Sequence, residues 1–160
     1  MSPVNYIERT RAFFEARGFP PYRWAENETA PWTPFEKPLE ESRVALLSSG
    51  GIYHTDQPPF NPDRDDLTFR EILSDVDVGE LRISHNNYDH RDADQDVNCV
   101  FPIERFRELE EEKYIGELAP TSYTLMGRIF RLSALRAELA PQIVERLKEA
   151  QVDVLFAVPA

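Results

Sequence analysis

The sequence predicts an α/β protein with three layers and a mainly parallel sheet. Two short apolar runs, residues 43–47 and 152–158, have the composition of strands covered on both sides, as parallel strands are. The first run continues directly into Ser-Ser-Gly-Gly, and the second follows a helix with an apolar side. Strand, long excursion, helix and strand is the layout of an α/β domain. We therefore expect a Rossmann-like half in residues 43–160.

An irregular segment, residues 1–42, precedes this predicted domain. It begins with a predicted helix over residues 3–17, which Ser2 can cap, Pro3 can open and Gly18 can end. The stretch after the helix is rich in proline, which is incompatible with regular helix or a central strand. Its two tryptophans favour a segment that wraps over a surface, because disordered linkers contain few aromatic residues.

The first part of the α/β domain contains two predicted strands. Arg43–Leu47 is the first, and residues 80–84, which alternate between apolar and polar, are the second. Between them, residues 52–79 hold several proline and aspartate turn signals and are expected to form a long loop. A short helix is predicted to start within this loop near Leu67.

The second part of the domain contains two predicted helices. Pro102 opens the first, and Gly116 is its stop signal. Residues 119–127 are expected to be irregular, and Ser133 is expected to cap a short turn. Pro141 starts the second helix, which leads into the last strand. This strand matters for function, because ligands in α/β folds bind beyond the carboxyl ends of the strands.

Composition excludes several classes of function. The net charge is −11 and the sequence pI about 4.7, so the chain lacks the clustered Lys and Arg that nucleic acid or anionic lipid requires. The single cysteine, Cys99, allows no internal disulfide and no cysteine-rich zinc site. No apolar run reaches the ~20 residues of a membrane span, and the N-terminus has no signal-peptide core. We expect a cytoplasmic protein.

A polar cluster, residues 85–98, is the strongest local signal for chemistry. It contains two histidines five positions apart with carboxylates around them, which suits either acid–base catalysis or a divalent metal. An acidic surface loop with incidental histidines explains the same pattern. The candidate catalytic residues are His54, His85, His90, Tyr88, Asp89 and Glu117. The candidate metal ligands are His85, His90 and Asp92.

The Ser-Ser-Gly-Gly loop after the first strand is the candidate substrate-binding loop. Its members Ser48, Ser49, Gly50 and Gly51 could hold an anion through their backbone N–H groups. An ordinary tight turn explains the same four residues. Cys99 is expected to be a small buried apolar side chain, since free cysteine is among the most buried residue types.

Three stretches resemble one known family. They are "RVALLSSGGIYHTDQPPF", "DVDVGELRISHNNYDHRDADQDVNCVFPIERFRELEEEKYIGELAPTSYTLMG" and "APQIVERLKEAQVDVLFAVPA". They are similar to the glycine/sarcosine/betaine reductase selenoprotein B family, and most closely to its D-proline reductase branch. The resemblance covers roughly residues 24–160. It implies an oxidoreductase that cleaves a C–N or C–X bond of a small amino acid or amine-like substrate.

The resemblance also implies a redox residue beyond residue 160. In that family the strand matching "DVLFAVPA" runs into selenocysteine or cysteine, then proline, one variable residue and a second cysteine. A selenolate or thiolate there would attack the substrate and resolve as an Se–S or S–S bond. We therefore expect residues 43–160 to be the N-terminal part of a longer reductase, inactive alone, with a UGA codon at position 161 as one explanation. The family further implies a partner reductase subunit.

Two other functions stay open at this point. One is a metal-dependent hydrolase or lyase that uses the histidine–aspartate cluster and a divalent metal. The other is a non-catalytic binding module. The reductase hypothesis predicts an apolar face where the rest of the enzyme packs, and hence a homo-oligomer of this chain.

Overall fold

The computed structural model describes residues 5–21, 26, 28–30 and 33–160. The chain divides into two compact units, residues 1–35 and residues 36–160. The predicted helix cap Ser2 and the first-position Pro3 lie outside the described residues.

The N-terminal unit contains one helix, α1 (Tyr6–Glu15), among its described residues. Asn5 caps it, because its side-chain oxygen accepts a hydrogen bond from the Glu8 backbone N–H. Gly18 ends the helical segment with a φ of +77°, as predicted. No residue of α1 is buried.

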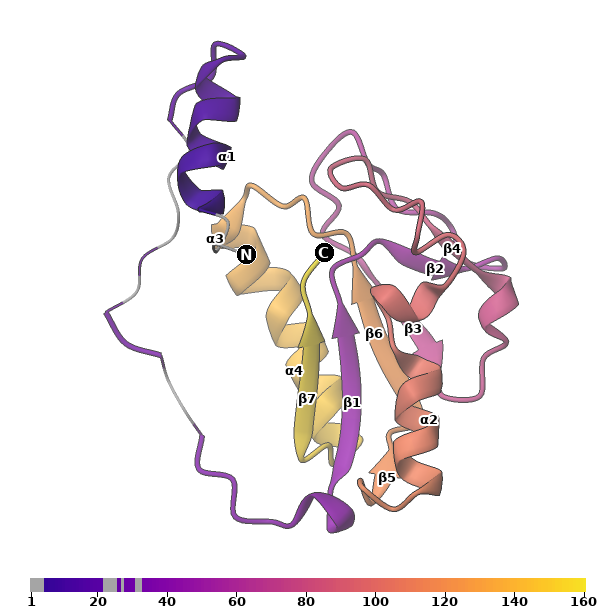
Figure 1. Cartoon of the computed structure of the whole chain (residues 1–160). Helices are drawn as coiled ribbons and strands as arrows, with labels where there is room; N and C mark the ends of the chain where they lie inside the picture. Colours follow the sequence, from indigo (N-terminus) through magenta and orange to yellow (C-terminus); the bar gives the residue numbers. More distant parts are fainter. Residues whose placement is uncertain (1–4, 22–25, 27, 31–32) are drawn as a thin grey trace. The chain divides into compact units, whose positions relative to one another are not determined.

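The second unit is built on a five-stranded sheet. Its central strand β1 (Arg43–Ser48) pairs in parallel with β7 (Val154–Val158) on one side. On its other side β1 pairs in parallel with β5 (Glu117–Leu118) and then with β6 (Thr121–Leu125). The last strand, β3 (Phe69–Leu73), pairs antiparallel with β6. The predicted mainly parallel sheet is confirmed, and Figure 1 shows β1, β6 and β7 pointing to one edge.

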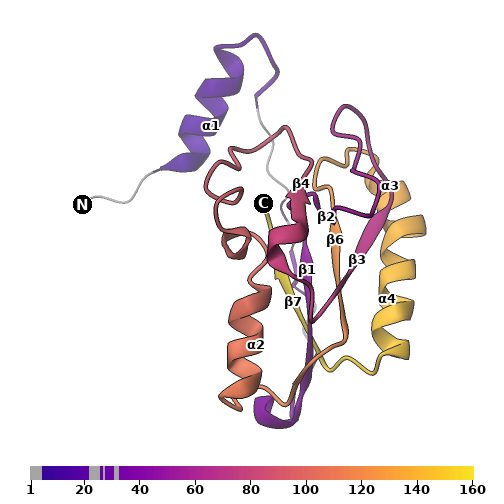
Figure 2. The same cartoon turned by 90° about the vertical axis from the view of Figure 1, so that its right-hand side faces the viewer.

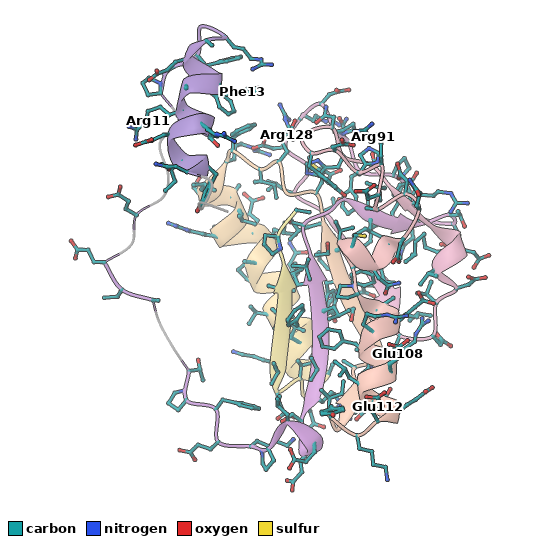
Figure 3. The ribbon with its side chains drawn as sticks, viewed as in Figure 1. Arg11, Phe13, Arg91, Glu108, Glu112 and Arg128 are labelled. Carbon is teal, nitrogen blue, oxygen red and sulfur yellow. The ribbon has the colours of Figure 1, made fainter. Side chains whose placement is uncertain are left out.

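Helices cover both faces of this sheet, with α2 (Ile103–Glu111) on one face and α4 (Ala140–Glu149) on the other (Figure 2). The alternation of β1 explains the two layers. Val44 and Leu46 pack in the apolar cluster that contains α2, whereas Ala45 and Leu47 pack in the cluster that contains α4. Exposed Glu108 lies on the outer side of α2, and exposed Glu112 is its C-cap residue (Figure 3).

The helix on the α4 side is longer than predicted. The predicted short turn after Ser133 is helix α3 (Leu132–Ala134), which continues through a π-helical stretch, Leu135–Leu139, into α4. Pro141 lies in the first turn of α4, directly after the π-helical stretch. The short 3₁₀ helices are Leu39–Glu41, Val78–Glu80 and Val97–Cys99.

Several predictions are wrong, including the long loop over residues 52–79, which contains the strands β2 (Ile52–His54) and β3. The short helix near Leu67 is absent, because residues 69–73 form β3 and pair along their whole length with β6. Residues 119–127, predicted irregular, contain β6. Cys99 is exposed, since it lies in a surface 3₁₀ turn.

The predicted strand over residues 80–84 is confirmed as β4 (Leu81–Ile83). It pairs antiparallel with β2 (Ile52–His54) in a separate two-stranded sheet. The predicted last strand is also confirmed, but not its burial on both sides. Leu155 is 40% exposed and Phe156 is 46% exposed, because β7 is an edge strand.

None of the helices in the described part of the chain has the length and hydropathy needed to cross a bilayer.

Candidate active site

The Ser-Ser-Gly-Gly loop lies at the edge where the parallel strands end. The Ser49 backbone N–H donates to the carbonyl of Val158 at the end of β7, with an N···O distance of 3.1 Å. The Gly51 N–H donates to the carbonyl of Leu125 at the end of β6, at 3.0 Å. These two bonds fix the loop between the carboxyl ends of β6 and β7, which is the position where α/β folds bind ligands.

Gly51 lets the loop approach the segment after β4. Its φ is +71°, and a Cβ atom there would lie 2.5 Å from the backbone oxygen of Ser84. A Cβ at Gly50 would lie 3.3 Å from the hydroxyl of Tyr88. The two glycines therefore bring the histidine-containing segment against the strand-end loop.

The backbone N–H groups of the Ser-Ser-Gly-Gly loop already have acceptors within the protein. The N–H groups of Ser49 and Gly51 are bound to strand carbonyls, and the Gly50 N–H donates to the Ser48 hydroxyl at 3.1 Å. A hydrogen already held by a protein oxygen is not available to a ligand anion. The loop consequently cannot offer these three backbone donors without losing its own structure.

The two serines of the loop have different roles. Ser48 is fully buried, and its hydroxyl donates to the Val100 carbonyl at 2.7 Å, so it joins β1 to the segment before α2. Ser49 is partly exposed, and its hydroxyl accepts a hydrogen bond from the Ala160 N–H at 2.9 Å. Of the two hydroxyls, that of Ser49 lies at the end of β7.

Three aromatic rings pack beside the loop at steep angles to one another. The rings of His85 and Tyr88 are 4.7 Å apart between centroids, and those of Tyr88 and His90 are 5.7 Å apart. The Tyr88 hydroxyl donates to the Gly50 carbonyl at 3.0 Å. Burial raises the pKa of Tyr88 to about 12, so the phenol stays protonated and keeps this donor. His85, Tyr88 and the strand-end loop therefore lie together.

His85 has a free proton donor in a buried position. The ring is 7% exposed, and its Nδ1 accepts a hydrogen bond from the Asn87 backbone N–H at 3.0 Å. The neutral ring must then carry its proton on Nε2. That Nε2 has no hydrogen-bond partner among the described residues. Burial, followed by the charge of His90, lowers the pKa of His85 and favours the neutral ring.

Arg128 is a second unsatisfied buried donor, and sequence reasoning missed it. It follows β6 by three residues, next to Gly127, whose N–H donates to the Ser49 carbonyl at 2.8 Å (Figure 3). Its Nη1 is buried and has no hydrogen-bond partner in the described part of the chain. A buried guanidinium N–H without an acceptor is costly, so this group is suited to a ligand carboxylate.

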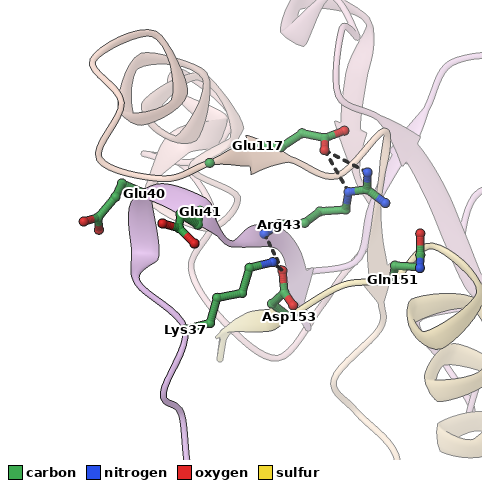
Figure 4. Close-up of a pocket in the computed structure, with 8 residues that line it drawn as sticks. Lys37, Glu40, Glu41, Arg43, Glu117, Gln151 and Asp153 are labelled. Carbon is green, nitrogen blue, oxygen red and sulfur yellow. Dashed lines mark hydrogen bonds and ion pairs between the residues drawn. The ribbon is translucent and has the colours of Figure 1, made fainter.

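Two predicted catalytic residues lie elsewhere. Glu117 is at the amino end of β1, where its carboxylate binds the Arg43 guanidinium at 2.8 Å (Figure 4). It cannot orient the histidines, which lie at the opposite edge. His54 is at the end of β2 and pairs with Asp56 and Glu80, the hydrogen bond to Asp56 being the main cause of its raised pKa. It does not join the site at the strand ends.

The predicted metal site does not fit the geometry. His85 Nδ1 accepts a hydrogen bond from a backbone N–H, so the Nε2 of the neutral ring carries the proton and has no lone pair for a metal. Asp92 is exposed, and Asp89 is occupied by Arg91. No three His, Cys, Asp or Glu side chains among the described residues are grouped as metal ligands. We therefore derive no step through a metal.

Comparison with known proteins identifies the family. The profile of the family described as glycine/sarcosine/betaine reductase selenoprotein B matches residues 22–158. This chain belongs to that family. The selenoprotein B family predicted from the sequence is thus confirmed. No solved structure matches the chain.

Individual relatives agree with this assignment. The chain is 36% identical over 125 residues to D-proline reductase subunit gamma of Acetoanaerobium sticklandii, covering 78% of this chain and 51% of that protein. It is 31% identical over 137 residues to glycine reductase complex component B subunit gamma of Symbiobacterium thermophilum, covering 81% and 31%. It is 30% identical over 125 residues to betaine reductase complex component B subunit beta of Peptoclostridium acidaminophilum, covering 73% and 28%. The chain spans about half the length of the first of these selenoprotein B relatives and less of the others.

Proposed function

We propose that this chain forms the strand-end part of a reductase site that cleaves a C–N or C–X bond of a small amino acid or amine-like substrate. One observation carries the proposal. Ala160, which follows β7 after Pro159, is held by the Ser49 hydroxyl at the edge where His85 is buried. A redox residue placed directly after Ala160 would stand beside the strand-end loop. Family membership supplies the class of reaction.

In this proposal a selenolate or thiolate after Ala160 attacks the substrate carbon. A new Se–C or S–C bond forms, the C–N bond breaks, and the amine leaves with a proton. A second thiolate then attacks the selenium or sulfur, the bond to carbon breaks, and the carbon takes up a proton. The two electrons come from the selenol–thiol or dithiol pair, which is left as an Se–S or S–S bond.

The chain's own residues assist at two points. Arg128 pairs with the substrate carboxylate, because its buried Nη1 has no acceptor within the described residues. The Nε2–H of neutral His85 donates a hydrogen bond to the leaving nitrogen or the developing charge on carbon. A separate subunit that holds the substrate amine is also part of the proposal, since relatives bear the names of reductase complex components.

The reactivity of a thiol at the end of β7 tests this proposal. We expect a cysteine added directly after Ala160, followed by Pro-Gly-Ser, to react with iodoacetamide at pH 7 about tenfold faster than the exposed Cys99, because in this proposal the Arg128 cation lies close to the thiol and keeps it ionised. Arg128→Met should remove most of that difference.

Arg91→Met is the matched control, since Arg91 is exposed and paired with Asp89. It should leave both alkylation rates unchanged. An added cysteine that reacts no faster than Cys99, or whose rate ignores Arg128→Met, would sink the proposal.

A further inference from the structure

The two edge strands of the sheet, β3 and β7, differ in composition, and only β7 has the composition of a strand that pairs on both sides. Strand β3, at one edge, contains Arg70 and Glu71, and Glu71 forms an ion pair with Arg146 of α4. Charged residues of this kind keep an edge strand from pairing with other chains. Strand β7, at the other edge, consists only of Val, Leu, Phe and Ala. In the described part of the chain β7 pairs with β1 alone.

Apolar surface continues from β7 over both faces of the sheet. On the α2 face, Phe156 is half exposed and its ring lies 5.0 Å from that of Phe106. On the α4 face, Leu155 lines a groove of about 590 Å³ together with exposed Val144. Strands of a parallel sheet are normally buried on both faces, whereas β7 has an exposed apolar side chain on each.

The groove on the α4 face also reaches the candidate active site. Its lining includes Ser49 and Gly127, the residues that meet at the ends of β1 and β6. A polypeptide that covers the groove therefore also closes one side of the strand-end edge.

We propose that the β7 edge and this groove receive a parallel strand and an apolar-faced helix from a polypeptide equivalent to the part of the selenoprotein B relatives that this chain does not cover. The inference deepens the proposed function and rests on it for the identity of the occupant. The D-proline reductase relative contains about as much chain again as the matched part. The strands beside β1 all run parallel to it, so another parallel strand continues the same sheet.

A second copy of this chain is a poorer occupant. A symmetric dimer through β7 would have to pair the two β7 strands antiparallel, and each copy carries a net charge of −11. A parallel strand from another polypeptide requires neither an antiparallel pair of β7 strands nor the approach of two copies that each carry a net charge of −11.

The test uses the part of Acetoanaerobium sticklandii D-proline reductase subunit gamma outside the matched segment as a separate polypeptide. Co-expressed with this chain, it should form a 1:1 complex by light scattering, with backbone amides of β7 protected from hydrogen exchange. Leu155→Asp should weaken the complex at least tenfold. Leu73→Asp, at an exposed position on the other edge strand, should not.

Three results would overturn the inference. They are the absence of a complex, a complex that depends on Leu73 rather than Leu155, and a homodimer whose β7 amides are protected. The outcome is separable from that of the thiol experiment. A complex through β7 combined with an unreactive added cysteine would remove the proposed function and leave the docking surface.

Discussion

Replacing Gly51 by alanine is expected to lower the free energy of unfolding by more than about 2 kcal/mol, the largest effect of any single change at the site. The φ of +71° costs a residue with a Cβ about 1–2 kcal/mol. In addition, the new Cβ would lie 2.5 Å from the Ser84 backbone oxygen, so β1 or the segment after β4 must shift. Urea unfolding followed by circular dichroism measures the change.

Gly79→Ala is the matched control. Gly79 lies in an exposed turn, and the atom nearest to a new Cβ is a side-chain oxygen of Asp77, at 3.1 Å. Its substitution should change the free energy of unfolding by less than about 1 kcal/mol. Equal losses of unfolding free energy in the two variants would mean that Gly51 does not lie against the Ser84 backbone oxygen.

Ser48→Ala is expected to lower the free energy of unfolding by about 1–3 kcal/mol, the cost of leaving buried polar groups without partners. The Ser48 hydroxyl donates to the Val100 carbonyl and accepts from the Gly50 N–H, and the residue is fully buried. Alanine leaves both backbone groups unpaired in a place that water does not reach. The same urea titration measures the loss.

The control for this prediction is Ser133→Ala. Ser133 is exposed on α3, so its substitution should stay within about 0.5 kcal/mol of the unchanged protein. If Ser48→Ala changes the free energy of unfolding as little, the Ser48 hydroxyl does not connect β1 to the segment before α2. Ser48 would then return as a candidate substrate-binding residue.

The apolar strands β1 and β7 were predictable, whereas β3, β5 and the polar strand β6 were not. β1 and β7 are apolar runs, so their pattern alone indicates strands. β6 buries Ser122 and Thr124, and their hydroxyls bond to the backbone of β1 and β2. Serine and threonine in a sequence pattern indicate a loop. Only the folded structure shows that their hydroxyl groups have hydrogen-bond partners in neighbouring strands.

The candidate site was predictable only in outline. A strand followed by Ser-Ser-Gly-Gly indicates the strand-end loop, and the polar cluster indicates His85. The sequence does not show that the loop N–H groups already have acceptors within the protein. Nor does it separate Glu117 from the histidines, since that separation follows from the pairing of β5 with the amino end of β1. Arg128 was missed because β6 was missed.

The sequence of the source gene beyond codon 160 tests the central claim most directly. The claim is that the redox residue of the reductase follows β7 at the edge where Ser49 holds Ala160. We expect the next codon to be an in-frame UGA for selenocysteine or a cysteine codon, followed by codons for proline, any residue and cysteine. A UAA or UAG stop codon, or a continuing frame without that motif, would contradict the claim and remove the redox chemistry from this edge of the sheet.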